Sequence, residues 1–208
     1  MNTKAGPTLK VSSIRASIVT LGIHSGRAAL HVALSSDIET EPVHVAEIFS
    51  RLLANEFYRK DMVLVIEDSK DETLSHRHIL DLIAIAKGHF DLIRVSTNGT
   101  NHRFYKEAIE SKLNHDFETA LLPERPLGGE YHVPHRLVCW WATELVFPFT
   151  HTEDAVPDWA LVLGKPLSIV PRNTHLPPDP HDYEVNRRAM AYAIKHNLRY
   201  CCPNMYIR

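Results

Sequence analysis

Cysteine and glycine are scarce in this chain, which has three cysteines and eight glycines in 208 residues. Cys139, Cys201 and Cys202 all lie in the C-terminal third of the sequence, and none forms a C-x-x-C pair. Adjacent cysteines rarely bond to each other. The sequence therefore argues against a small disulfide-stabilised domain and against a cysteine-rich metal module, and we expect reduced, partly buried thiols.

Long apolar runs are also missing. No segment approaches the roughly 20 consecutive apolar residues that a membrane helix needs. Residues 1–10, MNTKAGPTLK, lack the apolar centre of a signal peptide. We therefore expect a soluble, cytoplasmic protein with no membrane partner.

Neither sign of charge dominates. The formal net charge is -2 and the isoelectric point is near 6.7, with Lys and Arg spread along the chain. A nucleic acid partner needs a concentrated basic surface, so we do not expect one. The phosphate-loop, dinucleotide and G-x-S-x-G motifs are absent as well, which argues against nucleotide binding and serine-hydrolase chemistry.

Segments with strand-like and helix-like patterns alternate along the chain. This alternation predicts parallel strands joined by right-handed crossovers, in an α/β sheet or a partial barrel. The length suits a single α/β domain over residues 1–208. The predicted strands are 13–22, 28–36, 62–68, 90–96 and 117–123, and the predicted helices are 42–57 (Pro42 in its first turn), 75–88 (Ser75 as N-cap), 101–113 and 182–197.

A Thr-Asn-Gly-Thr turn follows the strand predicted at 90–96. The carboxyl ends of parallel strands are where ligands bind in such sheets. Gly99 would allow a positive φ, and Thr97, Asn98 and Thr100 would either cap the next helix or offer polar groups to a ligand. From the tetrapeptide alone, a plain strand-to-helix turn with an N-cap is the favoured explanation, because it needs no function.

Three segments in the same order resemble the 7-carboxy-7-deazaguanine synthases of the radical SAM superfamily. They are SIVTLGIHSGRAALHVAL (17–34), MVLVIED through STNGT (62–100), and LSIVPRN with AMAYAIKHNLRYCCPNMYI (167–173 and 189–207). The resemblance implies a partial (βα) barrel of radical SAM type with a mostly parallel sheet. Because the enzymes of that family are homodimers, it also implies a homodimer.

The chain departs from that family at its functional motifs. The C-x-x-x-C-x-x-C loop that holds a [4Fe-4S] cluster should follow residues 28–36, where the sequence has only DIETEP before the next predicted helix. The family's Gly-Gly-Glu-Pro turn falls on 67–70, its Gln-Gly-Glu-Gly substrate stretch on 19–22, and its Ser-Pro-Lys turn on 122–124. The site residues that match by position are Gly26, Arg27, Thr97, Asn98 and Gly99, which we take as a relic ligand pocket.

These departures favour a catalytically inactive pseudoenzyme with no cluster and no S-adenosylmethionine, because reductive cleavage of a sulfonium needs an electron from a cluster. We expect a protein-interaction or regulatory module with an unidentified protein partner. The module itself either retains a small-ligand pocket or has lost it. Aromatic residues at 140, 141, 147 and 149 suit either an interface or a core strand.

The 14 histidines support a different hypothesis, a metal-dependent, hydrolase-like enzyme in the vacated barrel mouth. His24 and His31 flank the Gly26-Arg27 turn and are the best metal candidates. Two further groupings of histidines and carboxylates lack a spacing with known ligand geometry. Scattered surface histidines are the simpler explanation of both. These groupings are Glu72, His76, His78 and Asp81, and His175, Asp179, His181 and Asp182.

Overall fold

The computed structural model describes residues 13–24, 27–35, 42–54, 58–68, 72–113, 115–125, 129–171 and 179–201, with the backbone alone for 13–24. Its strands form one nine-stranded sheet in the order β3-β1-β2-β4-β5-β6-β7-β8-β9. The strands are β1 (Ser13–His24), β2 (Arg27–Leu34), β3 (Pro42–His44), β4 (Val63–Asp68), β5 (Leu92–Thr97), β6 (Glu118–Leu121), β7 (Glu144–Phe149), β8 (Leu167–Pro171) and β9 (Arg199–Tyr200).

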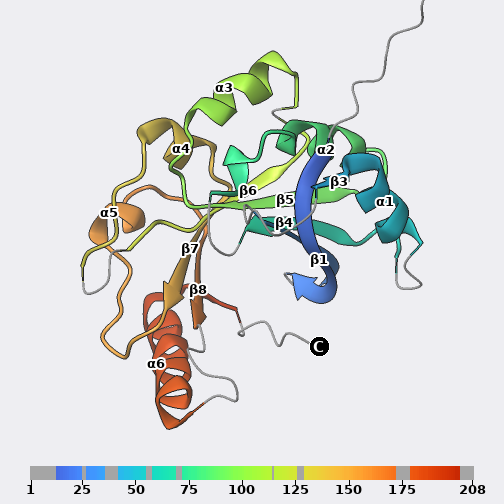
Figure 1. Cartoon of the computed structure of the whole chain (residues 1–208). Helices are drawn as coiled ribbons and strands as arrows, with labels where there is room; N and C mark the ends of the chain where they lie inside the picture. The colour runs from blue at the N-terminus through green and yellow to red at the C-terminus, as the bar shows by residue number, and fades with distance from the viewer. Residues whose placement is uncertain are drawn as a thin grey trace, which may run out of the picture.

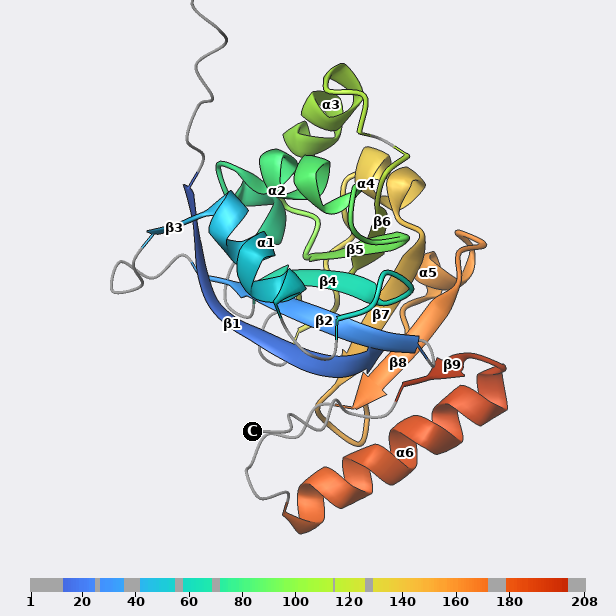
Figure 2. The same cartoon turned by 90° about the vertical axis from the view of Figure 1, so that its right-hand side faces the viewer.

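The sheet is parallel from β2 to β9 along its order. Only β1 is antiparallel to its neighbours β2 and β3. The sheet curls, and α1 and α6 lie at opposite ends of it (Figures 1 and 2). The predicted α/β partial barrel with a mostly parallel sheet is confirmed.

Six α-helices occur in the described part of the chain. They are α1 (Val45–Leu53), α2 (Ile79–Ala86), α3 (Arg103–Glu110), α4 (Arg136–Trp141), α5 (Asp158–Leu161) and α6 (Pro180–His196), with a short 3-10 helix, η1 (Thr73–Ser75), before α2. None of these helices is long and apolar enough to cross a membrane.

Two predicted helix starts are wrong. Pro42 begins no helix, because Pro42–His44 pair with β1 at the edge of the sheet, where a missing proline N–H leaves no ladder bond unmade. Ser75 is not the N-cap of α2, because it ends η1 and His78 takes the capping position. At Pro42–His44 the pairing with β1 outweighs the local helix pattern.

The main hydrophobic core lies between the outer face of the sheet and the helices. Alternate strand residues such as Leu64, Ile66, Ile93 and Val95 face outward and are buried. Every α-helix contributes buried residues to this core: Val45, Ile48, Phe49, Leu52, Ile79, Leu82, Ile83, Ala86, Phe104, Tyr105, Ala108, Val138, Cys139, Ala160, Val185, Ala189 and Ala193.

The inner face of the sheet differs in chemistry along its width. Around β2 and β4 it has a small apolar cluster of Ala29, Val63 and Val65. From β5 onward, polar residues also occur in inward register, and Arg94, Glu144 and Ser168 are all buried there. This polar interior and the carboxyl ends of the strands are the places to look for a functional site.

Candidate functional site: the turn after β5 and the inner face of the sheet

The turn that follows β5 has the backbone geometry predicted for it. Gly99 has a φ of 86°, in the left-handed region. A Cβ atom at this position would lie 2.8 Å from Leu121 Cδ1 and 3.2 Å from Val138 Cγ1. Glycine is therefore required here twice, by the backbone angle and by the close approach of β6 and α4.

A single carboxylate, that of Glu72, organises the turn. Its Oε1 accepts hydrogen bonds from Thr97 Oγ1 at 2.6 Å and from the Leu74 N–H at 3.0 Å. Its Oε2 accepts bonds from the N–H groups of Gly99 at 2.9 Å and Thr100 at 3.1 Å. Glu72 is 7% exposed and Thr97 is 3% exposed, so the contact is shielded from water.

The remaining polar groups of the turn also bond within the chain. Asn98 Nδ2 donates to Glu124 Oε1 at 2.6 Å, and Thr100 Oγ1 donates to Asn98 Oδ1 at 2.8 Å. The alternative that these side chains cap the next helix is wrong, because α3 begins at Arg103, with His102 at its N-cap and no side-chain capping bond. The turn thus holds the ends of β5 and β6 together through its own contacts.

The inner face of the sheet carries a buried ion-pair network. Arg94 of β5 donates a hydrogen bond from Nη2 to Glu144 Oε2 of β7, and Ser168 of β8 donates to Glu144 Oε1. Two weaker ion pairs surround it, Arg94 with Glu118 at 3.8 Å and Arg199 with Glu144 at 3.9 Å. Burial alone would raise the pKa of Glu144, but the positive charge of Arg94 and the hydrogen bonds from Ser168 and Arg94 outweigh it and lower that pKa below its ordinary value.

The cysteines that the structure describes are far apart in the fold. Cys139 lies in α4, buried on the outer side of the sheet, and its thiol donates to the Pro134 carbonyl at 3.7 Å. Cys201 directly follows β9 and lies near the Arg94–Glu144 network. Burial raises the pKa of both thiols, which keeps them protonated near neutral pH.

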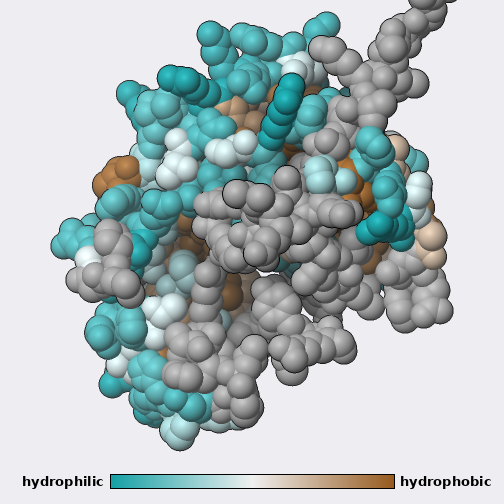
Figure 3. All heavy atoms as spheres, viewed as in Figure 1, coloured by the Kyte–Doolittle hydropathy of each residue, from teal (hydrophilic) through white to brown (hydrophobic). Residues whose placement is uncertain are grey.

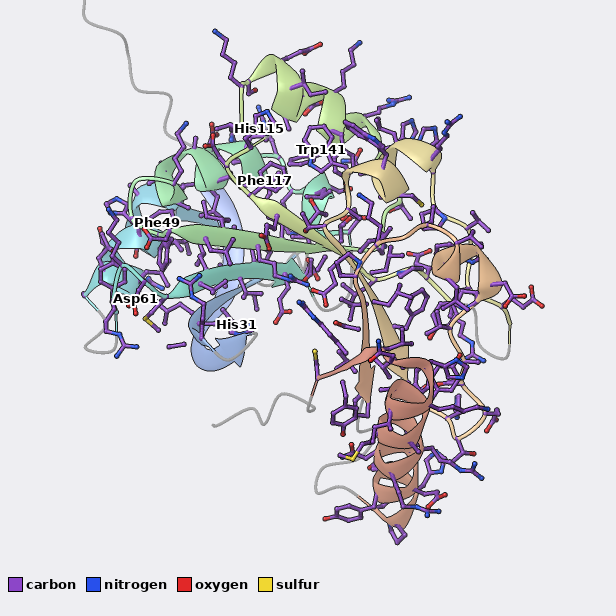
Figure 4. The ribbon with its side chains drawn as sticks, turned by 180° about the vertical axis from the view of Figure 1, so that it is seen from behind. His31, Phe49, Asp61, His115, Phe117 and Trp141 are labelled. Atoms are coloured by element: carbon purple, nitrogen blue, oxygen red, sulfur yellow. The ribbon has the colours of Figure 1, made fainter. Side chains whose placement is uncertain are left out.

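His31, a metal candidate, lies on the inner face of β2. It is 9% exposed, and its Nδ1 is 3.6 Å from Glu67 Oε1 of β4. Figure 4 shows it on the side of the sheet away from Phe49 and Phe117, which pack among the helices. The side chain of His24 lies outside the described residues, so the His24–His31 hypothesis stays a prediction.

The other histidine and carboxylate groupings form pairs. His76 Nε2 is 2.8 Å from Asp68 Oδ2, and His78 Nδ1 is 2.9 Å from Asp81 Oδ2. Asp179 and Asp182 form the capping box at the start of α6, and His175 lies outside the described residues. Within the part of the chain that is described, no three His, Cys, Asp or Glu residues are grouped so that they could hold a metal ion.

Arg27 does not lie beside the Thr97-Asn98-Gly99 turn. It begins β2, and its Nη2 donates to the carbonyl of Asp61, just before β4 begins. Because β2, β4 and β5 are parallel, this is the amino edge of the sheet, whereas Thr97 is at the carboxyl edge. Gly26, the neighbour of Arg27, lies outside the described residues.

Sequence reasoning missed Arg94, Glu144 and Ser168, and it considered Glu72 only within a histidine and carboxylate grouping, not as the partner of the turn. Arg94 and Glu144 had a usable signal, since each is a charged residue within or at the end of an otherwise apolar strand. Glu72 had none, because nothing in the spacing of 72 and 97–100 shows that they meet. A buried carboxylate is typically held in this way by donors that are distant in sequence.

Comparison with solved structures supports the fold. The crystal structure of QueE from Escherichia coli matches with a TM-score of 0.55 at 13% sequence identity, over 91% of this chain and 92% of that chain. No protein-family model matches the sequence, and no curated protein is significantly similar to it. The chain therefore has a fold similar to that of QueE, a 7-carboxy-7-deazaguanine synthase, and at this identity the likeness extends to the fold alone.

Proposed function

We propose that this chain is a catalytically inactive relative of the radical SAM fold that works as a protein-interaction or regulatory module in the cytoplasm, as a homodimer. The proposal includes the absence of a [4Fe-4S] cluster and of bound S-adenosylmethionine. The single observation that carries it is the position of the cysteines. All three lie after residue 138, and none lies in the segment directly after β2, where the resemblance places the cluster loop.

The cysteines do not fit a cluster. A [4Fe-4S] cluster of this kind needs three thiolates from one loop. Cys139 is buried on the outer side of the sheet, and Cys201 is at the end of β9 near the inner face, so these two cannot bind one cluster from a single loop. We therefore derive no radical chemistry for this chain.

The residues around the expected cofactor site support the same proposal. Glu67 and Asp68 stand where the related enzymes have glycines, and they contact His31 and His76. Glu72 accepts the hydrogen bonds of the Thr97–Thr100 turn, and Arg94 and Glu144 form an ion pair on the inner face. These pairs satisfy locally the polar groups that would otherwise be offered to a ligand.

An exposed apolar surface supports the role in protein interaction. Val162 is 83% exposed and Trp140 is 71% exposed, with Leu161 and Leu163 partly exposed beside Val162. Lys165 Nζ donates to the Trp140 carbonyl at 2.8 Å, which joins the end of α4 to the segment after α5. Figure 3 shows hydrophobic residues at the surface in the region of α5. Phe147 and Phe149 are buried in the core and do not contribute to this surface.

Anaerobic reconstitution with iron and sulfide tests the loss of radical chemistry. We expect no stoichiometric iron or sulfide and no cluster absorbance in this protein, while E. coli QueE treated in parallel serves as the positive control. Binding of S-adenosylmethionine, measured by calorimetry on the reconstituted protein, should be undetectable. A stoichiometric four-iron cluster would overturn the proposal.

Sedimentation and partner capture test the interaction role. We expect a dimer in sedimentation velocity and the recovery of a specific cellular protein by affinity purification. Recovery should be lost when exposed charges around the barrel mouth are reversed, as in Glu124→Lys, and when the apolar surface is interrupted by Val162→Asp. A Glu107→Lys variant at an exposed position of α3 is the matched control. If the native chain sediments as a monomer, and if it recovers no protein that the Glu124→Lys and Val162→Asp variants fail to recover, the proposal is contradicted.

A metal-dependent, hydrolase-like enzyme is the second candidate. The contact of His31 with Glu67 on the inner face favours it, because an imidazole and a carboxylate are two of the ligands that such a site needs. Elemental analysis should then find stoichiometric zinc, manganese or iron that His24→Ala or His31→Ala abolishes. If the native chain contains no stoichiometric metal and His31→Ala leaves the metal content unchanged, the metal-dependent enzyme is ruled out.

A further inference from the structure

The Thr97–Thr100 turn presents its hydrogen-bond donors as a ready-made carboxylate site. Gly99 N–H and Thr100 N–H point to one oxygen of Glu72, and Thr97 Oγ1 points to the other. Thr100 Oγ1 adds a longer contact of 3.4 Å to the first oxygen. Both carboxylate oxygens are thus held by neutral donors from a single turn.

The donors are positioned by contacts that do not involve Glu72. The positive φ of Gly99 sets the direction of its N–H, and the Thr97 carbonyl accepts from the Leu122 N–H at 2.8 Å. The Thr100 N–H and hydroxyl also donate to Asn98 Oδ1, and Asn98 is itself held by Glu124. The turn should therefore keep its shape when the Glu72 side chain is removed.

The chemistry of the donors selects the class of ligand. They are backbone N–H groups and threonine hydroxyls, and in the part of the chain that the structure describes no Lys or Arg forms an ion pair with Glu72. A phosphate dianion is usually bound with cationic partners, whereas a monocarboxylate is satisfied by neutral donors at this spacing. The donors of the turn are arranged around the two oxygens of one carboxylate group.

We propose that the Thr97–Thr100 turn is a carboxylate-binding site whose resident ligand is the side chain of Glu72. In the native chain the covalent connection gives Glu72 a high effective concentration at the turn, so a free carboxylate competes poorly. Removal of the Glu72 carboxylate opens the site to a small monocarboxylate such as formate. This inference goes beyond the proposed function and does not depend on whether the protein is catalytically active.

Formate rescue of Glu72→Ala is the direct test. The variant leaves buried donors unsatisfied, so we expect its Tm to fall by roughly 5–10 °C relative to the native chain. A formate titration should then raise its Tm saturably by several degrees, as expected when a ligand binds the folded state alone. Sodium chloride at matched ionic strength should have no such effect.

The matched control is Glu124→Ala. Glu124 also presents a carboxylate to the turn, accepting from Asn98, but at an exposed position where water replaces it. Its Tm, and that of the native chain, should respond to formate no more than to chloride. Equal responses of all three proteins, or a Glu72→Ala variant as stable as the native chain, would overturn the proposal.

A second variant covers the case in which Glu72→Ala does not fold. Glu72→Gln keeps the shape of the side chain but replaces one acceptor oxygen with an NH₂ group. In the amide NMR spectrum, Gly99 or Thr100 should then shift strongly, while Glu107→Gln at an exposed position of α3 should leave both near their native positions. Unshifted Gly99 and Thr100 resonances in Glu72→Gln would show that the carboxylate is not bound there.

Discussion

Gly99 shows how much one residue can be constrained by its surroundings. Its φ of 86° is costly for a residue with a Cβ atom, and the added atom would also overlap Leu121. Gly164 offers a comparison within the same chain, because its φ is 65° but an added Cβ atom would have no neighbour within 4 Å. A comparison of Gly99 with Gly164 therefore separates the cost of backbone strain, which both positions share, from the cost of steric overlap, which arises at Gly99 alone.

We predict that Gly99→Ala destabilises the protein more than Gly164→Ala does. Backbone strain should cost about 1 kcal/mol at each site. Overpacking against Leu121 should add about 2 kcal/mol at Gly99 alone. Urea unfolding of both variants measures the difference, and equal losses would mean that β6 and α4 move aside without cost.

The residues of the turn also show the limit of sequence reasoning. The positive φ of Gly99 followed from glycine between a strand and a helix, and the structure confirms it. The partner of the turn did not follow, because Glu72 lies at the start of η1, after the neighbouring strand β4, and is distant from the turn in sequence. Local propensity predicts the conformation of a turn, whereas its partners depend on which strands become neighbours.

At the scale of elements, α6 is the helix whose ends are best specified. Asp179 accepts a hydrogen bond from the Asp182 N–H, and Asp182 accepts one from the Asp179 N–H, with Pro180 at the first helical position. The helix ends at His196, and its C-cap Asn197 has a left-handed φ of 53°. The predicted helix 182–197 is confirmed, with its start two residues earlier at Pro180.

Replacement of the α6 cap should have a modest effect that depends on the side chain introduced. We predict that Asp179→Ala lowers the free energy of unfolding by about 1 kcal/mol, because an N-terminal N–H loses its acceptor. Asp179→Asn keeps an acceptor oxygen and should cost less than half as much. Thermal unfolding followed by circular dichroism distinguishes them, and an equal loss in both variants would contradict a capping role.

Element boundaries were predicted well where the pattern was strong and poorly where the sheet intervened. The apolar runs of β4 and β5 fix those strands to within two residues. The helix pattern at 42–57 fails at its start, since β1 offers Pro42–His44 hydrogen-bond partners that a helix does not. Periodicity cannot report such a pairing, because the partner residues of β1 lie much earlier in the chain.

At the scale of the whole molecule, the Arg94–Glu144–Ser168 network joins β5, β7 and β8 across the inner face. The folded state lowers the pKa of Glu144. A carboxylate of this kind stabilises the fold at pH values above its unfolded pKa, which is about 4.3, and that contribution is lost as the pH falls toward the folded pKa. The pKa of Asp154 is lowered too, because the hydrogen bonds from Arg125 and from the backbone N–H groups of Thr150 and His151 outweigh the effect of burial. Its stabilising contribution is therefore also lost as the pH falls.

We predict that Glu144→Gln lowers the free energy of unfolding by about 3 kcal/mol at neutral pH, because it leaves the buried Arg94 without its closest counter-charge. The difference from the native chain should shrink as the pH falls below the unfolded pKa of about 4.3 and toward the lowered folded pKa, where Glu144 itself becomes protonated. Urea unfolding at several pH values measures this. Glu184→Gln at the surface of α6 is the control, and a pH-independent difference for Glu144→Gln would rule out the ionised network.

The order of the strands also bears on how the chain reaches its native state. From β5 to β9, each strand of the sheet lies beside the strand that precedes it in the sequence. As a polypeptide leaves the ribosome from its N-terminus, every new strand in this series therefore meets a template that has already been synthesised. Synthesis and sheet growth can proceed in the same direction, one crossover at a time, and β9 with its adjoining cysteine is added last.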